Sequence, residues 1–297
     1  MNDDALNLSI SYSGGLANEN RVDLYDIAQA MVGFQRSIAL TTHLVLNGEI
    51  ITQAPFLKGA TIHALPPMNG SWKMNTVVVL TGLYSLGSLQ NNSPLGHLIF
   101  SLYDYVISES LGVRVDLNKS LAVLYEEAQK KKQDLPKIQQ YQADSLIEKC
   151  STAIHEMHRP IYKTGTAERA DISCTIGSRS LPLQTAFTLN TWEYIHETRT
   201  SEAPQKFVGR ISSYNSNTFK GRVYVQELGH PVSFELAKDT RTERVVELVT
   251  TSLKNNALRQ YSDSDDNIFF SAFLRTSRTG RLKSLLITKL SDKPLAN

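Results

Sequence analysis

The sequence predicts an α+β fold: an N-terminal strand and helix domain with a helical bundle, followed by a C-terminal small β-barrel. Its 297 residues exceed the roughly 100–200 residues that one hydrophobic core usually serves. The last third of the chain contains three strand patterns, one helical pattern and two further strand patterns. We therefore expect one domain over residues 1–204, helical at about 93–160, and a barrel domain over residues 205–297.

The first expected elements are a strand, a long helix and a pair of strands. ALNLSISYSGG alternates apolar and polar residues and ends in two glycines, which is typical of a strand and a turn. RVDLYDIAQAMVGFQRSIALTTHLVLNG has apolar residues at helical spacing, with Asp23 as the expected N-cap and Gly48 as the end. Two strands then flank Asn69-Gly70, a strong turn signal. Asp26 is interpreted as an ordinary carboxylate on a helix surface.

Three helices are expected next, the first starting at Ser93-Pro94 and the last ending before Pro160. The region that follows has a weaker pattern. In it, ADISCTIG suggests a strand and FTLNTWEYIHETRT an extended segment. We place the domain boundary at Pro204 of the segment SEAP.

The most apolar stretches are residues 76–89 and 95–107. Each has about 13 residues, whereas a helix that crosses a membrane needs roughly 20. We expect both stretches in a hydrophobic core. The alternative is a membrane-associated or self-assembling effector that acts through residues 76–107.

After Pro204 the sequence indicates strands at KFVGRIS, RVYVQEL and VSFEL, a helix at RTERVVELVTTSLKNNALRQY, and strands at IFFSAFLR and LKSLLITKL. This order resembles that of the OB-fold, a small Greek-key barrel. From Lys206 to the end, 15 lysines and arginines stand against 9 aspartates and glutamates, a net charge of +6, while the preceding residues carry −4. The predicted barrel is thus the basic part of the chain.

The resemblance implies a ligand site on the face of the second and third strands, between the loops that join strands one to two and four to five. If Val223 and Val225 point inward, Arg222, Tyr224 and Gln226 point outward, because side chains alternate along a strand. Aromatic rings in a cationic groove are typical of proteins that bind single-stranded nucleic acid. The candidate residues for this binding are Tyr214, Phe219, Lys220, Arg222, Tyr224, Arg275, Arg278, Arg281 and Lys283.

A different reading fits the same surface. Arginine and tyrosine suit any half-exposed strand, so a barrel that contacts a protein partner or a second copy of the chain would also carry them. Three carboxylates near one predicted loop, Asp263, Asp265 and Asp266, would repel a phosphate chain. Single-stranded nucleic acid and a protein partner or homo-oligomer are therefore both expected ligands.

No motif in the sequence indicates a reaction. HEMH, residues 155–158, spaces its histidines three apart, whereas a metalloprotease helix needs them four apart. Cys150 and Cys174 lie at no recognisable zinc spacing from these histidines, and no phosphate-binding glycine loop or G-x-S-x-G is present. We expect no metal, no cofactor and a non-catalytic protein. An enzyme whose site lies between the domains and is built from distant residues is the alternative.

SLYDYVISESLGVRVDLNKSL resembles uncharacterised bacterial proteins of comparable length, some of them from phage-defence-type loci. The resemblance implies a bacterial or phage setting and carries no activity. Two cysteines are too few for a disulfide framework, and the first ten residues lack the pattern of a secretory signal. The sequence therefore favours a cytoplasmic protein.

Overall fold

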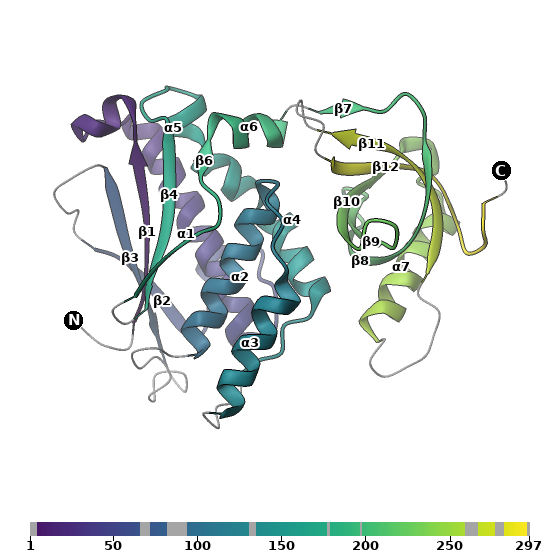
Figure 1. Cartoon of the computed structure of the whole chain (residues 1–297), viewed down its shortest axis with the longest axis horizontal. Coiled ribbons are helices and arrows are strands. Elements are labelled where there is room, and N and C mark those ends of the chain that lie inside the picture. Colours follow the sequence, from purple (N-terminus) through teal and green to yellow (C-terminus); the bar gives the residue numbers. More distant parts are fainter. Residues whose placement is uncertain are drawn as a thin grey trace. The chain divides into compact units, whose positions relative to one another are not determined.

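The protein is an α+β chain with two compact units, seen in a computed structural model (Figure 1). The first unit comprises Met1–Ile138 and Lys149–Trp192, and the second comprises Gln139–Glu148 and Glu193–Asn297. The structure describes residues 5–65, 72–81, 94–130, 135–176, 179–196, 198–258, 267–276 and 282–295. The expected turn at Asn69-Gly70, the helix start at Ser93 and the three carboxylates at residues 263–266 lie outside these ranges.

An antiparallel sheet forms one layer of the first unit. Its order is β2-β3-β1-β4-β5, and β6 pairs with β4. The alternation predicted for the first strand is confirmed, because its apolar side chains from Leu6 to Tyr12 are buried. The strands are β1 (Ala5–Ser13), β2 (Ala60–Ala64), β3 (Lys73–Leu80), β4 (Arg169–Ile176), β5 (Arg179–Pro182) and β6 (Phe187–Thr188).

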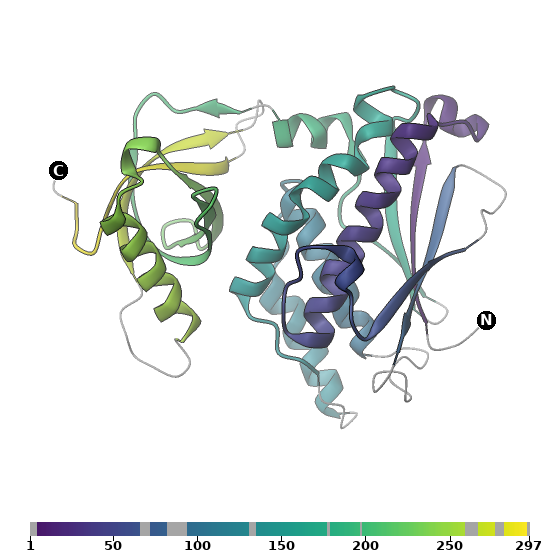
Figure 2. The same ribbon diagram turned by 180° about the vertical axis from the view of Figure 1, so that it is seen from behind.

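Helices form the second layer, on one face of this sheet (Figures 1 and 2). Asp23 caps the first long helix as predicted, since its side chain accepts a hydrogen bond from the Asp26 amide at 2.9 Å. That helix ends at Gly48, which has a φ of 71°. The helices of the chain before the barrel are α1 (Leu24–Asn47), α2 (Pro94–Ser110), α3 (Leu117–Lys130), α4 (Gln140–Met157), α5 (Arg159–Tyr162) and α6 (Leu189–His196), with 3₁₀ turns η1 (Gly15–Glu19) and η2 (Ala54–Phe56).

The weakly patterned region resolves into both kinds of element. The strand expected at ADISCTIG is present as β4. The extended segment expected at FTLNTWEYIHETRT is mostly wrong, because α6 covers Leu189–His196 between two-residue strands. Thr188 and Thr191 explain the helix: the Thr188 amide donates to Thr191 Oγ1 at 2.8 Å, and the Thr191 amide donates to Thr188 Oγ1 at 3.3 Å. These two bonds satisfy amides at the helix start.

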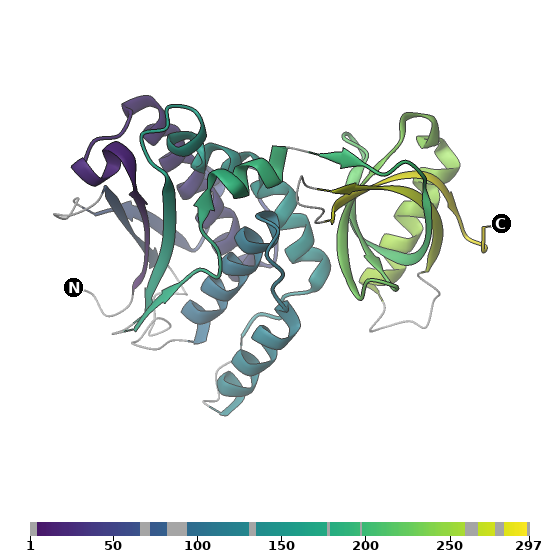
Figure 3. The same ribbon diagram turned by 45° about the horizontal axis from the view of Figure 1, so that its top comes forward.

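The second unit contains a closed five-stranded barrel, as predicted (Figure 3). The strand order is β12-β10-β9-β8-β11, and pairing of β11 with β12 closes the ring. Only β10 and β12 run parallel among the neighbours in the described ring. The elements are β7 (Arg199–Thr200), β8 (Gln205–Asn215), β9 (Lys220–Val225), β10 (His230–Leu236), η4 (Lys238–Thr240), α7 (Glu243–Ala257), β11 (Ile268–Thr276) and β12 (Leu282–Ser291).

The barrel core is apolar, and two glycines let its strands approach closely. Val223, Phe234 and Phe270 are at most 2% exposed, and Val249 of α7 joins the same core. Gly221 of β9 lies so close to the Ser213 carbonyl of β8 that a Cβ atom would overlap it, and Gly209 meets the Tyr224 carbonyl in the same way. Glycine at such positions permits a close approach of two backbones.

Candidate functional site

Cationic side chains from three segments of the barrel meet at one carboxylate, Glu235 of β10. Arg275 of β11 donates from Nη1 to Glu235 Oε2 at 2.7 Å, and Arg241, which follows β10, donates from Nη2 to Oε1 at 3.1 Å. Lys220 is opposite Glu235 in the β9–β10 ladder and is exposed. Burial opposes ionisation of Glu235, but the bonds and charges of Arg275, Lys220 and Arg241 outweigh it and lower the pKa of Glu235.

An aromatic ring completes this group. The Arg241 guanidinium lies 4.8 Å from the centroid of the Phe219 ring, in the turn between β8 and β9. Phe219 has a φ of 55°, which is uncommon for a residue other than glycine. We call Phe219, Lys220, Glu235, Arg241 and Arg275 the Glu235 cluster. Three cations and one carboxylate leave it with excess positive charge.

Arg222 does not face solvent, so that expectation is wrong. Val223 and Val225 do point into the core, as predicted, which turns Arg222 to the outer side of the strand. That side is covered: Arg222 is 4% exposed, and its Nε lies 3.0 Å from Asp144 Oδ1 of α4. Its Nη2 also donates to the Pro231 carbonyl at 3.2 Å. A buried guanidinium needs such partners, because desolvation of an unpaired charge is costly.

The cover over Arg222 is the stretch Gln139–Glu148, which belongs to the second unit. Ser212 of β8 donates from Oγ to Asp144 Oδ2 at 2.6 Å, and Ser233 of β10 is hydrogen-bonded to Glu148. Burial raises the pKa of Glu148, although Arg222 and Lys220 act in the opposite direction. We call Ser212, Arg222 and Ser233 the Arg222 face.

This burial predicts an unusual effect of Glu148→Gln. A carboxyl with a raised pKa in the folded state destabilises the fold once it is ionised, and the penalty disappears as the pH falls below the pKa of the unfolded chain, about 4.3. Glutamine keeps a partner for Ser233 and removes the penalty. We expect Glu148→Gln to stabilise the second unit at pH 7–8 and to confer no gain near pH 4. Hydrogen exchange of the barrel amides at both pH values measures this; equal gains at both would contradict it.

The remaining candidate residues are engaged elsewhere or lie outside the described ranges. Tyr224 is half-buried, with the Arg210 guanidinium 4.2 Å from its ring centroid. The Tyr214 ring is stacked on Phe234 at 6.3 Å and packs against the core. Lys283 donates from Nζ to the Ile195 carbonyl at 3.0 Å and to Thr198 Oγ1 at 2.7 Å. Arg278 and Arg281 fall within residues 277–281, which are not described.

The structure therefore brings together Phe219, Lys220 and Arg275 of the candidate residues. Arg241 belongs with them but was missed by sequence reasoning, because it follows the third strand of the barrel and lies in neither expected ligand loop. The sequence gives only a weak indication of Arg241, because it is a single cation between a predicted strand and a predicted helix.

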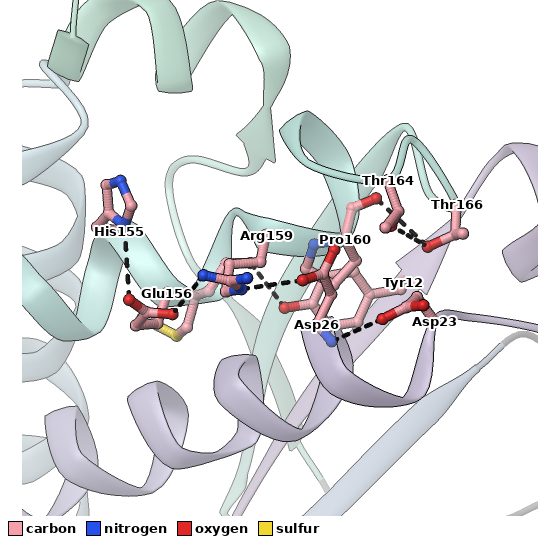
Figure 4. Close-up of polar contacts among 10 residues, drawn as sticks. Tyr12, Asp23, Asp26, His155, Glu156, Arg159, Pro160, Thr164 and Thr166 are labelled. Carbon is pink, nitrogen blue, oxygen red and sulfur yellow. Dashed lines mark hydrogen bonds and ion pairs between the residues drawn. The ribbon is translucent and has the colours of Figure 1, made fainter.

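A second polar group lies in the first unit, around Arg159 of α5 (Figure 4). Arg159 donates from Nε to Asp26 Oδ1 at 3.0 Å and from Nη1 to Glu156 Oε2 at 3.4 Å, and its guanidinium lies 5.1 Å from the Tyr25 ring centroid. Asp26 is 2% exposed, so its interpretation as a surface carboxylate is wrong. The pair joins the first turn of α1 to α5. Next to this pair, the Tyr12 hydroxyl of β1 donates to the Met157 carbonyl at the end of α4, at 2.7 Å.

The histidines of HEMH have structural partners. His158 is buried, with Nδ1 2.9 Å from the Ile154 carbonyl and Nε2 3.0 Å from Thr191 Oγ1. His155 Nδ1 lies 3.7 Å from Glu156 Oε1. Within the described residues, no group of three or more histidine, cysteine, aspartate or glutamate side chains is placed to hold a metal ion.

Both cysteines are free and buried. Burial raises the pKa of the Cys150 thiol to about 12, and it also raises the pKa of the Cys174 thiol. Because the thiolate is the nucleophilic form, neither side chain is activated at neutral pH.

The apolar stretches lie in the first unit. Residues 76–80 belong to β3, in which Val78 and Leu80 are buried and Val77 and Val79 are half-buried, and the helix α2 buries Leu98, Leu102 and Val106. Residues 82–93 are not among the described residues. No helix in the described ranges is both long enough and apolar enough to cross a membrane.

Fold and site together define a two-unit α+β protein whose C-terminal barrel carries a cationic cluster. A family model described as "Domain of unknown function (DUF7946)" matches residues 8–196, and one described as "Family of unknown function (DUF7947)" matches residues 203–291. Since the first match spans more than half of the chain, the chain belongs to the DUF7946 family. No curated protein and no solved structure matches it.

Proposed function

We propose that the C-terminal barrel is a recognition module that binds single-stranded nucleic acid at the Glu235 cluster. The observation that carries this proposal is the convergence of Lys220, Arg241 and Arg275 on one carboxylate beside the Phe219 ring. Phe219 lies in the turn between the first two barrel strands, Lys220 starts the second strand, Glu235 lies on the third, Arg241 follows the third, and Arg275 is near the end of the fourth. This position agrees with the ligand site of OB-folds, whose element order the barrel shares.

The chemistry of the cluster suits a phosphodiester chain with unpaired bases. Lysine and arginine neutralise phosphates and release counterions, and a ring can stack on a base for about 1–3 kcal/mol. Glu235 opposes an anion, but it also holds two guanidinium groups in fixed positions. Groups fixed before binding lose less entropy when the ligand arrives.

The wider setting of this proposal is a non-catalytic protein of a bacterial or phage cytoplasm, with the first unit serving assembly or signalling. The resemblance of SLYDYVISESLGVRVDLNKSL to proteins of phage-defence-type loci supports the setting. Two buried, free thiols fit a reducing compartment.

Binding of a fluorescent oligothymidylate, followed by anisotropy at two salt concentrations, tests the proposal. Lys220→Ala removes an exposed cation of the cluster, so we expect weaker binding at low salt and a salt slope reduced by about one phosphate contact. Lys254→Ala is the matched control. Lys254 is an exposed lysine in the last turn of α7, roughly 16 Å along the helix from Glu243, the first residue of α7 after Arg241. Its replacement should leave the salt slope of binding unchanged.

The proposal of a site at the Glu235 cluster is contradicted if Lys220→Ala and Arg241→Ala raise the Kd for the oligonucleotide no more than Lys254→Ala does. Absence of any oligonucleotide binding contradicts nucleic-acid recognition and favours a protein partner or a second copy of the chain, which sedimentation of the full chain would then examine.

A further inference from the structure

The face of the barrel that OB-folds commonly offer to ligands is occupied by the chain itself. Arg222 and Ser233 lie on β9 and β10, the second and third barrel strands, and the stretch Gln139–Glu148, which includes the start of α4, covers them. Asp144 is 0% exposed and Arg222 is 4% exposed, so water is excluded from their contact.

The contact has the chemistry of anion recognition. One oxygen of Asp144 lies 3.0 Å from Arg222 Nε, and the other accepts from Ser212 Oγ at 2.6 Å. A second carboxylate of the same helix, Glu148, is hydrogen-bonded to Ser233. A guanidinium and two hydroxyl groups that take up two carboxylates one helical turn apart would suit the oxygens of successive phosphates equally well.

The net stabilisation from a buried contact of this kind is expected to be small. Desolvation of both ions offsets much of the attraction in a buried ion pair, so such a pair is weak evidence of stability. Burial disfavours the ionised form of Glu148 even with Arg222 and Lys220 nearby. A ligand that brings its own anions can therefore compete with the helix.

We propose that the Arg222 face is a second part of the nucleic-acid site, and that Asp144 and Glu148 occupy it in place of phosphates. This inference rests on the proposed function and adds its regulation. Single-stranded nucleic acid held at the Glu235 cluster displaces Gln139–Glu148 and then pairs with Arg222. Lys220 lies between the Glu235 cluster and the Arg222 face. It is opposite Glu235 in the β9–β10 ladder, and its positive charge favours the ionised form of Glu148. The apparent affinity is reduced by the fraction of molecules in which the helix covers the face.

Neutralising substitutions of the two carboxylates are then expected to change the Kd for oligonucleotide in opposite directions. Asp144→Asn keeps the shape of the side chain but removes the charge of the carboxylate that lies 3.0 Å from Arg222 Nε, which weakens the covered state. We expect the Kd for oligothymidylate to fall roughly tenfold, equivalent to about 1.4 kcal/mol. Glu148→Gln relieves the burial of a charge, which strengthens the covered state and raises the Kd. Simple removal of negative charge would lower the Kd in both variants, so the opposite signs distinguish displacement from general electrostatics.

The experiment measures the anisotropy of labelled oligothymidylate with the full chain and these two variants. Asp292→Asn is the control, because it removes an exposed carboxylate of the same unit, and its Kd stays within twofold of the parent. Thermal melting by circular dichroism reports whether each variant folds. Hydrogen exchange of residues 139–148, with and without oligonucleotide, follows the helix directly.

Tighter binding by Asp144→Asn, weaker binding by Glu148→Gln and faster exchange of residues 139–148 on addition of oligonucleotide support the inference. It is overturned if both variants bind like the parent while Lys220→Ala still weakens binding, a result that leaves the proposed function intact. If Asp144→Asn does not fold, the Kd of Glu148→Gln tests the inference alone: a raised Kd supports it, and an unchanged or lowered Kd overturns it. If neither the parent nor a folded Asp144→Asn variant binds oligonucleotide, the inference and the proposed function both fail.

Discussion

Replacement of Arg159 by methionine is expected to destabilise the first unit by about 3 kcal/mol, the lower end of the cost of removing one partner of a buried ion pair, because the Arg159 side chain is 16% exposed. Asp26 is 2% exposed, and its Oδ2 has no hydrogen-bond partner among the described residues, so the loss of Arg159 would leave the whole carboxylate unpaired. The chain has two tryptophans, Trp72 and Trp192, and both lie in the first unit. Urea unfolding followed by tryptophan fluorescence therefore reports on this unit.

Two further variants show whether the ion pair causes the loss. Arg21→Met breaks the pair with Glu19, whose side chains are 68% and 62% exposed, and we expect a change of no more than about 1 kcal/mol. The double variant Asp26→Asn/Arg159→Met removes both charges and should recover much of the lost stability, since a buried pair can often be replaced as a whole. A double variant as unstable as Arg159→Met would show that packing of the arginine, and not its charge, holds α5 to α1.

The second large effect is expected from Gly221→Ala. By propensity alone, alanine within a strand should gain roughly 0.5–1 kcal/mol over glycine. At Gly221, however, the new Cβ atom would overlap the Ser213 carbonyl of the neighbouring strand. We expect a net loss of about 2–3 kcal/mol, the upper part of the usual range for overpacking, measured by urea unfolding with far-ultraviolet circular dichroism. The tryptophan transition of the first unit should not move.

Gly229→Ala separates steric overlap from backbone strain. Gly229 has a φ of 69°, and a Cβ atom added there would meet nothing within 4 Å. Its replacement should cost only about 1 kcal/mol, from the left-handed backbone. Losses of equal size at the two positions would argue against the close approach of β8 and β9 at Gly221.

The barrel was predictable because its signals are local. Each strand alternates over a few residues, and one helix stands between the third and fourth strands. The alternation also gave the inward direction of Val223 and Val225 correctly. It could not report that a helix some 80 residues earlier in the chain covers the outward side, because period-two patterns carry no information on what packs over a face. The exposure of Arg222 was predicted wrongly for that reason.

The polar networks were the least predictable features. Arg159 and Asp26 are 133 positions apart, and Asp144 and Ser212 are 68 apart. Each residue alone reads as an ordinary helix or strand residue. The Glu235 cluster was partly predictable, since Phe219, Lys220 and Arg275 were singled out from their loops, while Arg241 became significant only through its contact with Glu235.

The closure of the barrel by its last strand has a consequence during protein synthesis. β12, which ends at Ser291, is the strand that pairs with both β10 and β11. Until the ribosome has released it, the nascent chain exposes unpaired strand edges of the kind that associate with other chains. The barrel can therefore close only after Ser291 has left the ribosome, whereas the first unit can fold earlier.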